Sequence, residues 1–301
     1  MKPSIVPVLA LMIVTPLGYC TGASTYISLS SIYHSQTHTL LGQTANNDTL
    51  ATQLEWNSQK ERLKHSGWLA RGVQMSFASS SQYASISANL PIYHVSPQNG
   101  FWLSVYNRVE RFTATLETSR IYLDKEGNAS SVTSGSALTA DLISQGYEVY
   151  WKEDTLLPTL INEIGFVYQS QTTPIQVNLN STNATLFDGQ MTGWGIRLGK
   201  HLQPRGLSLD WDLAVLQLDT DFSNSVTEHR AVAPDESKCL WARFQLRGQY
   251  RHYITPYWYA APFVGLDLQG YIQQTRDPNI VEQPTSTVTK WQAGLQLQKW
   301  F

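Results

Sequence analysis

Three arginines recur at every fourth position of one stretch of the sequence: Arg243, Arg247 and Arg251. In an extended strand, residues four apart share a face, and their Cα atoms lie roughly 13 Å from one another. Preceding segments add four further charged side chains: Arg197, His201, Asp210 and Asp212. This set predicts either a wall that attracts an anionic solute or a network of charges that neutralise one another.

A second group places acidic residues and a histidine in one polar stretch. Its members are Asp219, Asp221, His229, Asp235 and Glu236. An aspartate and a histidine within hydrogen-bond reach could activate a water molecule for hydrolysis. A solvated loop without catalytic chemistry is the alternative, and we favour it because no further catalytic motif accompanies these residues.

Other motifs that carry chemistry are missing from the sequence. There is no Cys-x-x-Cys, no dinucleotide-binding or Walker glycine loop, and no Gly-x-Ser-x-Gly elbow. We therefore expect neither a metal nor a cofactor. With 21 Lys and Arg against 23 Asp and Glu, the net charge of −2 argues against a nucleic-acid partner.

The elements that must position these residues are strands, because apolar and polar residues alternate along the chain. One face of the segment from Leu240 carries Leu240, Ala242, Phe244, Leu246, Gly248 and Tyr250. The other face carries Trp241, Arg243, Gln245, Arg247, Gln249 and Arg251. A period of two over so many residues is the signature of a strand. The best candidate for a helix is the segment from Thr49 to Leu63.

The connections between these strands alternate between long and short. Long polar connections cover 124–137, 172–188, 220–238 and 275–286, and short ones containing proline cover 154–158, 203–206 and 254–256. Brief turns at one end and longer loops at the other are typical of an up-and-down barrel in an outer membrane. These connections predict eight strands from about Thr115. The segments 24–35, 68–78, 83–92 and 101–112 complete a barrel of twelve, with ten as the alternative.

Composition decides between a membrane barrel and a soluble β-sandwich or lipocalin-like barrel. Charged residues make up 15% of the chain, against roughly 25% in soluble domains. Aromatic residues gather at strand ends, for example at Phe101-Trp102, Tyr150-Trp151 and Trp300-Phe301. Such residues form girdles at the membrane interfaces. The predicted fold class is therefore all-β, an antiparallel up-and-down transmembrane β-barrel.

The N-terminus reads as a secretory signal peptide. One lysine is followed by a short apolar stretch and by small residues up to Ala23. We expect cleavage after Ala23, with the barrel domain covering 24–301. A lipoprotein signal ending at Cys20 is the alternative, and the bulky Tyr19 argues against it.

The last strand resembles the C-terminal signature of Gram-negative outer-membrane β-barrel proteins. Leu295, Leu297 and the terminal Phe301 match its alternating apolar pattern, whereas Lys299 departs from it. This resemblance implies insertion by the barrel assembly machinery and contact with outer-membrane lipid and lipopolysaccharide. Among subfamilies, the size and twelve strands are most similar to a solitary autotransporter-like barrel without a passenger domain. Omptin-type outer-membrane proteases resemble the acidic and histidine group at the rim.

The expected function is a non-enzymatic barrel that acts as a narrow, porin-like pore or as a structural membrane scaffold. Barrels of about eight strands are filled by side chains, whereas open channels need about 16. Twelve strands lie between these limits, and we favour the filled, charge-neutralised interior. A hydrolase at the external rim, either an omptin-like protease or a lipid-modifying enzyme, is the runner-up. The sequence predicts neither a particular small solute nor an oligomeric state.

Overall fold

The structure of this chain is a computed structural model. It describes residues 23–300 except for 41–42, 61–66, 69–71, 81–82, 97–98, 116–118, 124–128, 158–159, 173–174, 180–181, 202–205, 225–237 and 275–284. Of the predicted signal peptide, 1–23, all residues but Ala23 lie outside the described residues, and Ala23 is the first residue of β1. Among the described residues, no helix is long and apolar enough to cross a membrane.

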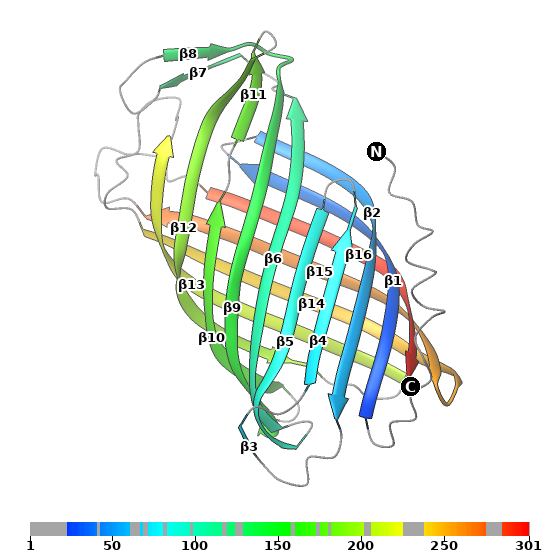
Figure 1. Cartoon of the computed structure of the whole chain (residues 1–301). Helices are drawn as coiled ribbons and strands as arrows, with labels where there is room; N and C mark the ends of the chain where they lie inside the picture. Colours follow the sequence, from blue (N-terminus) through cyan, green and yellow to red (C-terminus); the bar gives the residue numbers. More distant parts are fainter. Residues whose placement is uncertain are drawn as a thin grey trace.

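The chain forms a closed antiparallel barrel of twelve strands, and the predicted fold class is confirmed (Figure 1). The strands of the wall are β1 (Ala23–Leu40), β2 (Gln43–Lys60), β4 (Gly72–Ser79), β5 (Tyr83–Ser96), β6 (Asn99–Thr115), β9 (Ala137–Leu157), β10 (Ile161–Thr172), β12 (Thr182–Lys200), β13 (Gly206–Asn224), β14 (Lys238–Thr255), β15 (Trp258–Gln274) and β16 (Thr285–Trp300). Each wall strand pairs with its predecessor. The pairing of β1 with β16 closes the ring, so the wall has no free edge.

Short accessory strands lie at the two ends of the barrel. At one end, β7 (Arg120–Leu123) pairs with β8 (Ala129–Val132), and β11 (Ile175–Leu179) lies between β9 and β12. This end, at the top of Figure 1, also carries the connections across 225–237 and 275–284, and we call it the loop end. The opposite turn end carries the brief connections after β5, β9, β12 and β14, and β3 (Gly67–Trp68) pairs with β5 there.

Side chains alternate between the inside and the outside of the wall. On β14, Trp241 is only 3% exposed, whereas its neighbour Leu240 is 44% exposed. On β13, Ser208 is buried between the exposed Leu207 and Leu209. Many large apolar residues are exposed on the outside of the wall, and the residues turned inward include most of the charges of the described wall. This is the arrangement of a membrane barrel and the reverse of a soluble one.

The outer wall has the height of a membrane. Near the turn end, Phe101 pairs with Trp151, and their ring centroids lie 4.6 Å apart. Further along the same two strands, Arg111 and Asp141 form an ion pair on the outer surface. Ten residues of β6 separate these two levels, which corresponds to roughly 25 Å along the barrel axis for strands tilted by about 40°.

Two expectations about the elements are wrong, and they offset each other in the strand count. The segment from Thr49 to Leu63 is not a helix, because residues 49–60 belong to β2, where Leu50 faces out between the buried Thr49 and Ala51. Conversely, the wall strand expected from Thr115 does not exist, because residues 120–123 form β7 in a hairpin outside the wall. The first hairpin also departs from the expected order of connections, because β1 and β2 join through only residues 41–42 at the loop end.

Candidate functional site

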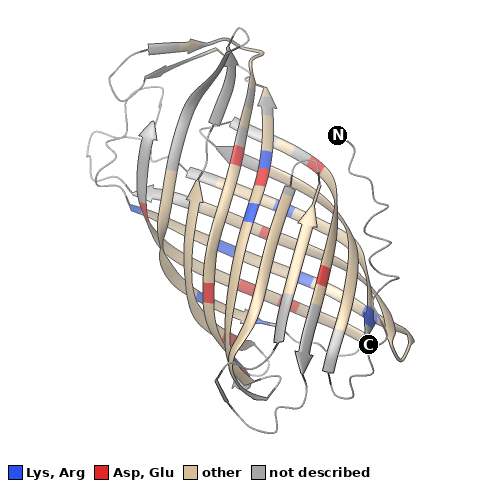
Figure 2. Ribbon diagram, viewed as in Figure 1, with Lys and Arg blue, Asp and Glu red and all other residues tan. Residues whose placement is uncertain are grey.

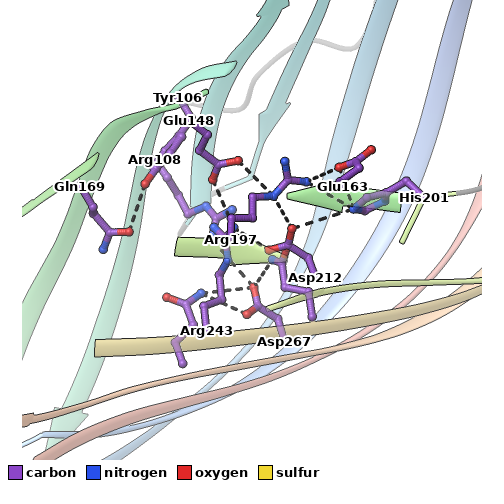
Figure 3. Close-up of polar contacts among 12 residues, drawn as sticks. Tyr106, Arg108, Glu148, Glu163, Gln169, Arg197, His201, Asp212, Arg243 and Asp267 are labelled. Carbon is purple, nitrogen blue, oxygen red and sulfur yellow. Dashed lines mark hydrogen bonds and ion pairs between the residues drawn. The ribbon is translucent and has the colours of Figure 1, made fainter. Parts of the chain in front are cut away.

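Inside the barrel, three of the predicted charged residues join two further carboxylates in a set of ion pairs that we call the central cluster. Its members come from the five consecutive wall strands β9, β10, β12, β13 and β14. In that order they are Glu148, Glu163, Arg197, Asp212 and Arg243 (Figure 3). All five are buried, with exposed fractions of 3–9%. They lie together because each occupies an inward-facing position on its strand.

Each guanidinium of the central cluster is shared between carboxylates. Arg197 contacts Asp212, and it lies 2.8 Å from the Glu163 carboxylate and 3.3 Å from Glu148. Arg243 lies 3.0 Å from Asp212 and 3.4 Å from Glu148. The remaining charge is balanced by Lys152, whose Nζ lies 3.2 Å from Glu163. The cluster with Lys152 therefore pairs three cations with three carboxylates.

His201 closes the central cluster at the turn end. Its backbone N–H donates to Asn162 Oδ1 at 2.9 Å, and its carbonyl accepts from Asn162 Nδ2 at 3.0 Å. Its Nε2 lies 3.9 Å from Glu163 and 4.0 Å from Asp212. Burial lowers the pKa of His201, but the two carboxylates outweigh burial and the opposing charge of Arg197, so the pKa is raised above 6.5.

A second set of ion pairs crosses the lumen, and we call these the transverse pairs. Lys290 Nζ on β16 lies 2.8 Å from Glu110 Oε1 on β6, and both side chains are almost completely buried. Arg108 on β6 lies 3.9 Å from Asp267 on β15. In the ring of twelve, β6 and β15 are six strands apart, and β6 and β16 are five apart. Side chains from opposite walls therefore meet inside the barrel.

Apolar side chains fill much of the remaining interior. A cluster from β10, β12, β13 and β14 is 0–3% exposed and consists of Val167, Met191, Ala214, Leu216, Leu218, Cys239 and Trp241. Phe112, Leu142 and Val288 form another. On β13 and β14 these residues lie on the loop-end side of the central cluster. The inward-facing side chains of each strand therefore change from charged to apolar toward the loop end.

Three predicted lumenal residues lie nearer the turn end, outside the central cluster. Arg247 and Arg251 are partly exposed on the inward phase of β14, and Asp210 lies opposite Arg247 in the strand register. The structure thus places all seven predicted residues on or beside the inner face, but it divides them between two levels of the lumen. Figure 2 shows the charged positions as isolated bands on otherwise uncharged strands.

The residues proposed for a rim hydrolase are only partly described. Asp219 is exposed near the loop end of β13, and it lies opposite Lys238 in the register. Asp221 lies on the same strand opposite Gln190, and His229 lies outside the described residues with the rest of that loop. Among the described residues, no group of three or more His, Cys, Asp or Glu side chains is arranged to hold a metal ion.

The terminal strand presents its predicted apolar residues outward. Leu295 and Leu297 are 46% and 40% exposed on β16, whereas Gln296 and Gln298, which alternate with them, face inward. Phe301 lies outside the described residues.

Several interior charges were not predicted from the sequence, namely Arg108, Glu110, Glu148, Lys152, Glu163, Asp267 and Lys290. Each lies at an inward-facing position of its strand. The alternation of side chains along β6, β9, β10, β15 and β16 could therefore have identified them. The pairing across the lumen has no such local signal.

No protein-family model matches the sequence, and no curated protein matches it. Similar solved structures are the translocator domain of the autotransporter NalP from Neisseria meningitidis (11% identity, 97% of this chain and 94% of that chain, TM-score 0.37) and the toluene transporter TodX from Pseudomonas putida (11%, 97% and 93%, 0.35). The outer membrane protease OmpT from Escherichia coli is similar at 7% identity over 96% of this chain and 99% of that chain, with a TM-score of 0.29. At TM-scores below 0.5, no residue role passes from these proteins to this chain.

Proposed function

We propose that this chain is an integral outer-membrane barrel with a closed lumen, acting as a structural scaffold that holds its loop end at the outer surface. The transverse pairs carry this proposal. Lys290 and Glu110 meet at 2.8 Å although their strands are five apart in the ring, and an open aqueous channel would keep such walls apart. Of the two roles expected from the sequence, pore and scaffold, this packing favours the scaffold.

The outer wall supports a location in the outer membrane. Exposed apolar residues occur on most wall strands, among them Phe166, Trp194, Val264 and Trp291. Every wall strand is paired on both sides, as strands in hydrocarbon must be. In this placement the brief turns face the periplasm and the loop end faces outward. Lipid and lipopolysaccharide surround the wall, and the barrel assembly machinery inserts it through the terminal strand.

The finer type is an autotransporter-like barrel. Twelve strands and the size of the chain support it, whereas the filled interior means that no polypeptide passes through the barrel in the described state. On this proposal, the wall and the loops of the barrel carry its role in the membrane, and its lumen does not.

Refolding tests the membrane barrel. Protein refolded in detergent should migrate differently on a gel when it is left unboiled, because a closed barrel resists denaturation by the gel detergent. Full solubility without detergent, with no such shift, would contradict the proposal.

Liposome swelling tests the closed lumen. Liposomes that carry the refolded protein should not swell in an isotonic solution of a small sugar such as arabinose, since the lumen admits no solute. Swelling at the rate of an open porin would contradict the scaffold function and support the pore function.

The rim hydrolase stays a prediction, with the exposed carboxylate of Asp219 at the loop end in its favour. It requires peptide or lipid hydrolysis by the refolded protein that His229→Ala and Asp219→Ala each abolish. Turnover that both variants retain would remove it.

A further inference from the structure

The three arginines of β14 divide into one that is neutralised and two that are not. Arg243 lies within 3.4 Å of both Asp212 and Glu148. No ion pair within 4.0 Å joins Arg247 or Arg251 to any carboxylate in the part of the chain that the structure describes. Two guanidinium groups therefore face the turn-end half of the lumen without a direct counter-ion among the described residues.

Aromatic rings support these two side chains in place of carboxylates. The Arg247 guanidinium carbon lies 4.0 Å from the centroid of the Phe263 ring, and that of Arg251 lies 5.6 Å from the Tyr259 ring. Both rings belong to β15 and are buried. A guanidinium stacked on a ring keeps its charge and a fixed plane, and its N–H groups remain directed outward from the ring edge.

Within the described part of the chain, most N–H donors of Arg247 and Arg251 have no acceptor. Arg247 Nη2 donates to Gln296 Oε1 at 3.4 Å, which is a long contact. The Nε–H groups of Arg247 and Arg251 are buried, and neither has a hydrogen-bond partner among the described residues. A guanidinium carries five N–H donors, and a buried donor without a partner costs free energy that a bound acceptor would recover.

Two carboxylates that act electrostatically on Arg247 determine which anions the site favours. Asp210 lies opposite Arg247 in the register, and Glu55 accepts a hydrogen bond from Tyr26 at 2.6 Å. Both act on Arg247 from beyond ion-pair distance. Because they offset part of the positive potential, an anion with one charge gains little here, whereas one with several charges still gains from both guanidinium groups.

We infer that Arg247 and Arg251 form a binding site for a soluble multivalent oxyanion, such as an oligophosphate, at the turn end of the lumen. Their Cα atoms are separated by four residues of strand, roughly 13 Å, so a ligand with acidic groups at two points fits the pair better than a single small anion. The site rests on the proposed function only for the side of entry, which is the periplasm.

Arginine side-chain NMR tests this site directly. The full chain, labelled with nitrogen-15 in arginine and folded in uncharged detergent, is titrated with tripolyphosphate and separately with acetate. Tripolyphosphate should move the Nε–H signals of Arg247 and Arg251 and leave that of Arg243 in place, and acetate should move none of them. No movement with tripolyphosphate, or equal movement at Arg243, would overturn the site.

Variants measure the contribution of each arginine. Arg247→Gln and Arg251→Gln should each weaken tripolyphosphate binding by about tenfold, because each removes one charge-assisted contact. Lys238→Gln is the matched control, since it removes one cation from the other end of the same strand, and it should leave the affinity unchanged. An equal loss in the control would mean that only net charge matters, and the site would be rejected.

Two outcomes separate this inference from the scaffold. If an arginine variant shows no shifted band in an unboiled sample, it has not folded, and the titration of the wild-type protein then tests the binding site alone. Swelling of liposomes with wild-type protein would end the scaffold proposal and leave phosphate binding intact. A sealed barrel that binds no tripolyphosphate would end this inference alone.

Discussion

The charged side chains of the central cluster and of the transverse pairs each have an oppositely charged partner on another strand, which offsets the cost of burying them. Lys290 and Glu110 are 2% and 1% exposed, so neither can be hydrated if the other is removed. A buried pair contributes little net stability compared with apolar residues of the same volume, but breaking it leaves one charge uncompensated. This asymmetry makes the pair testable.

Lys290→Met should lower the free energy of unfolding by about 3 kcal/mol, because the Glu110 carboxylate is then buried without its closest cation. The double variant Glu110→Gln/Lys290→Met should recover most of that loss. Urea unfolding of the refolded protein in detergent measures both values. If the double variant is less stable than either single one, the two side chains do not act as a pair.

The raised pKa of His201 predicts that the stability of the folded protein depends on pH. Its pKa is raised above 6.5 in the folded chain, so its contribution to stability is complete below that value. It is lost as the pH rises through the raised pKa. Between about pH 6 and about pH 9, the urea midpoint of the wild type should fall more than that of His201→Asn. Parallel curves for the two proteins would show that the histidine stays neutral.

Strands are the elements that the sequence predicts best here, and the reason is local. Alternation along β14 or β16 reports directly which side chains face in and which face out. The alternation is weaker in β2, where Leu50 and Leu54 are four apart as on a helix, and only pairing with β1 and β4 decides its structure. Pairing is a property of neighbouring strands, so a single segment cannot reveal it.

The candidate site shows the same limit more sharply. The arginine row was predictable because three residues of one strand suffice to define it. The pair of Lys290 and Glu110 was not, since 180 residues separate the partners and only closure of the ring sets them against each other. Which strands stand opposite depends on strand number, and that number is a property of the whole wall.

Glycines on the inner face allow neighbouring strands to curve closely around the lumen. A Cβ built at Gly195 would lie 2.0 Å from the backbone oxygen of Val215 on β13. At Gly248, on the outer face of β14, the nearest atoms would be 3.9 Å away. Gly195→Ala should therefore cost at least about 2 kcal/mol, and Gly248→Ala should be nearly neutral. Equal refolding yields and urea midpoints for the two variants would contradict this close approach.

The whole molecule is defined by a band of apolar side chains on its outer surface. Phe166, in the middle of β10, is 68% exposed, and Leu207, near the turn end of β13, is 78% exposed. Were the surroundings water, an arginine would be tolerated equally at both positions. In a bilayer the cost depends on depth.

Phe166→Arg should therefore destabilise the barrel in lipid vesicles by about 2–4 kcal/mol, and Leu207→Arg by about 1 kcal/mol or less. Unfolding of vesicle-inserted protein by guanidinium chloride measures the difference. Identical costs at the two positions would contradict a lipid-facing position for Phe166.

The central claim is that the lumen is closed by side chains from opposite walls, and single-channel recording in a planar bilayer tests it most directly. Refolded wild-type protein should insert and remain silent. Removing the transverse pairs, with Arg108→Ala/Glu110→Ala/Lys290→Ala, should produce discrete conductance steps, whereas the outer-wall control Arg111→Ala/Asp141→Ala should stay silent. Steady conductance steps from the wild-type protein would contradict the claim.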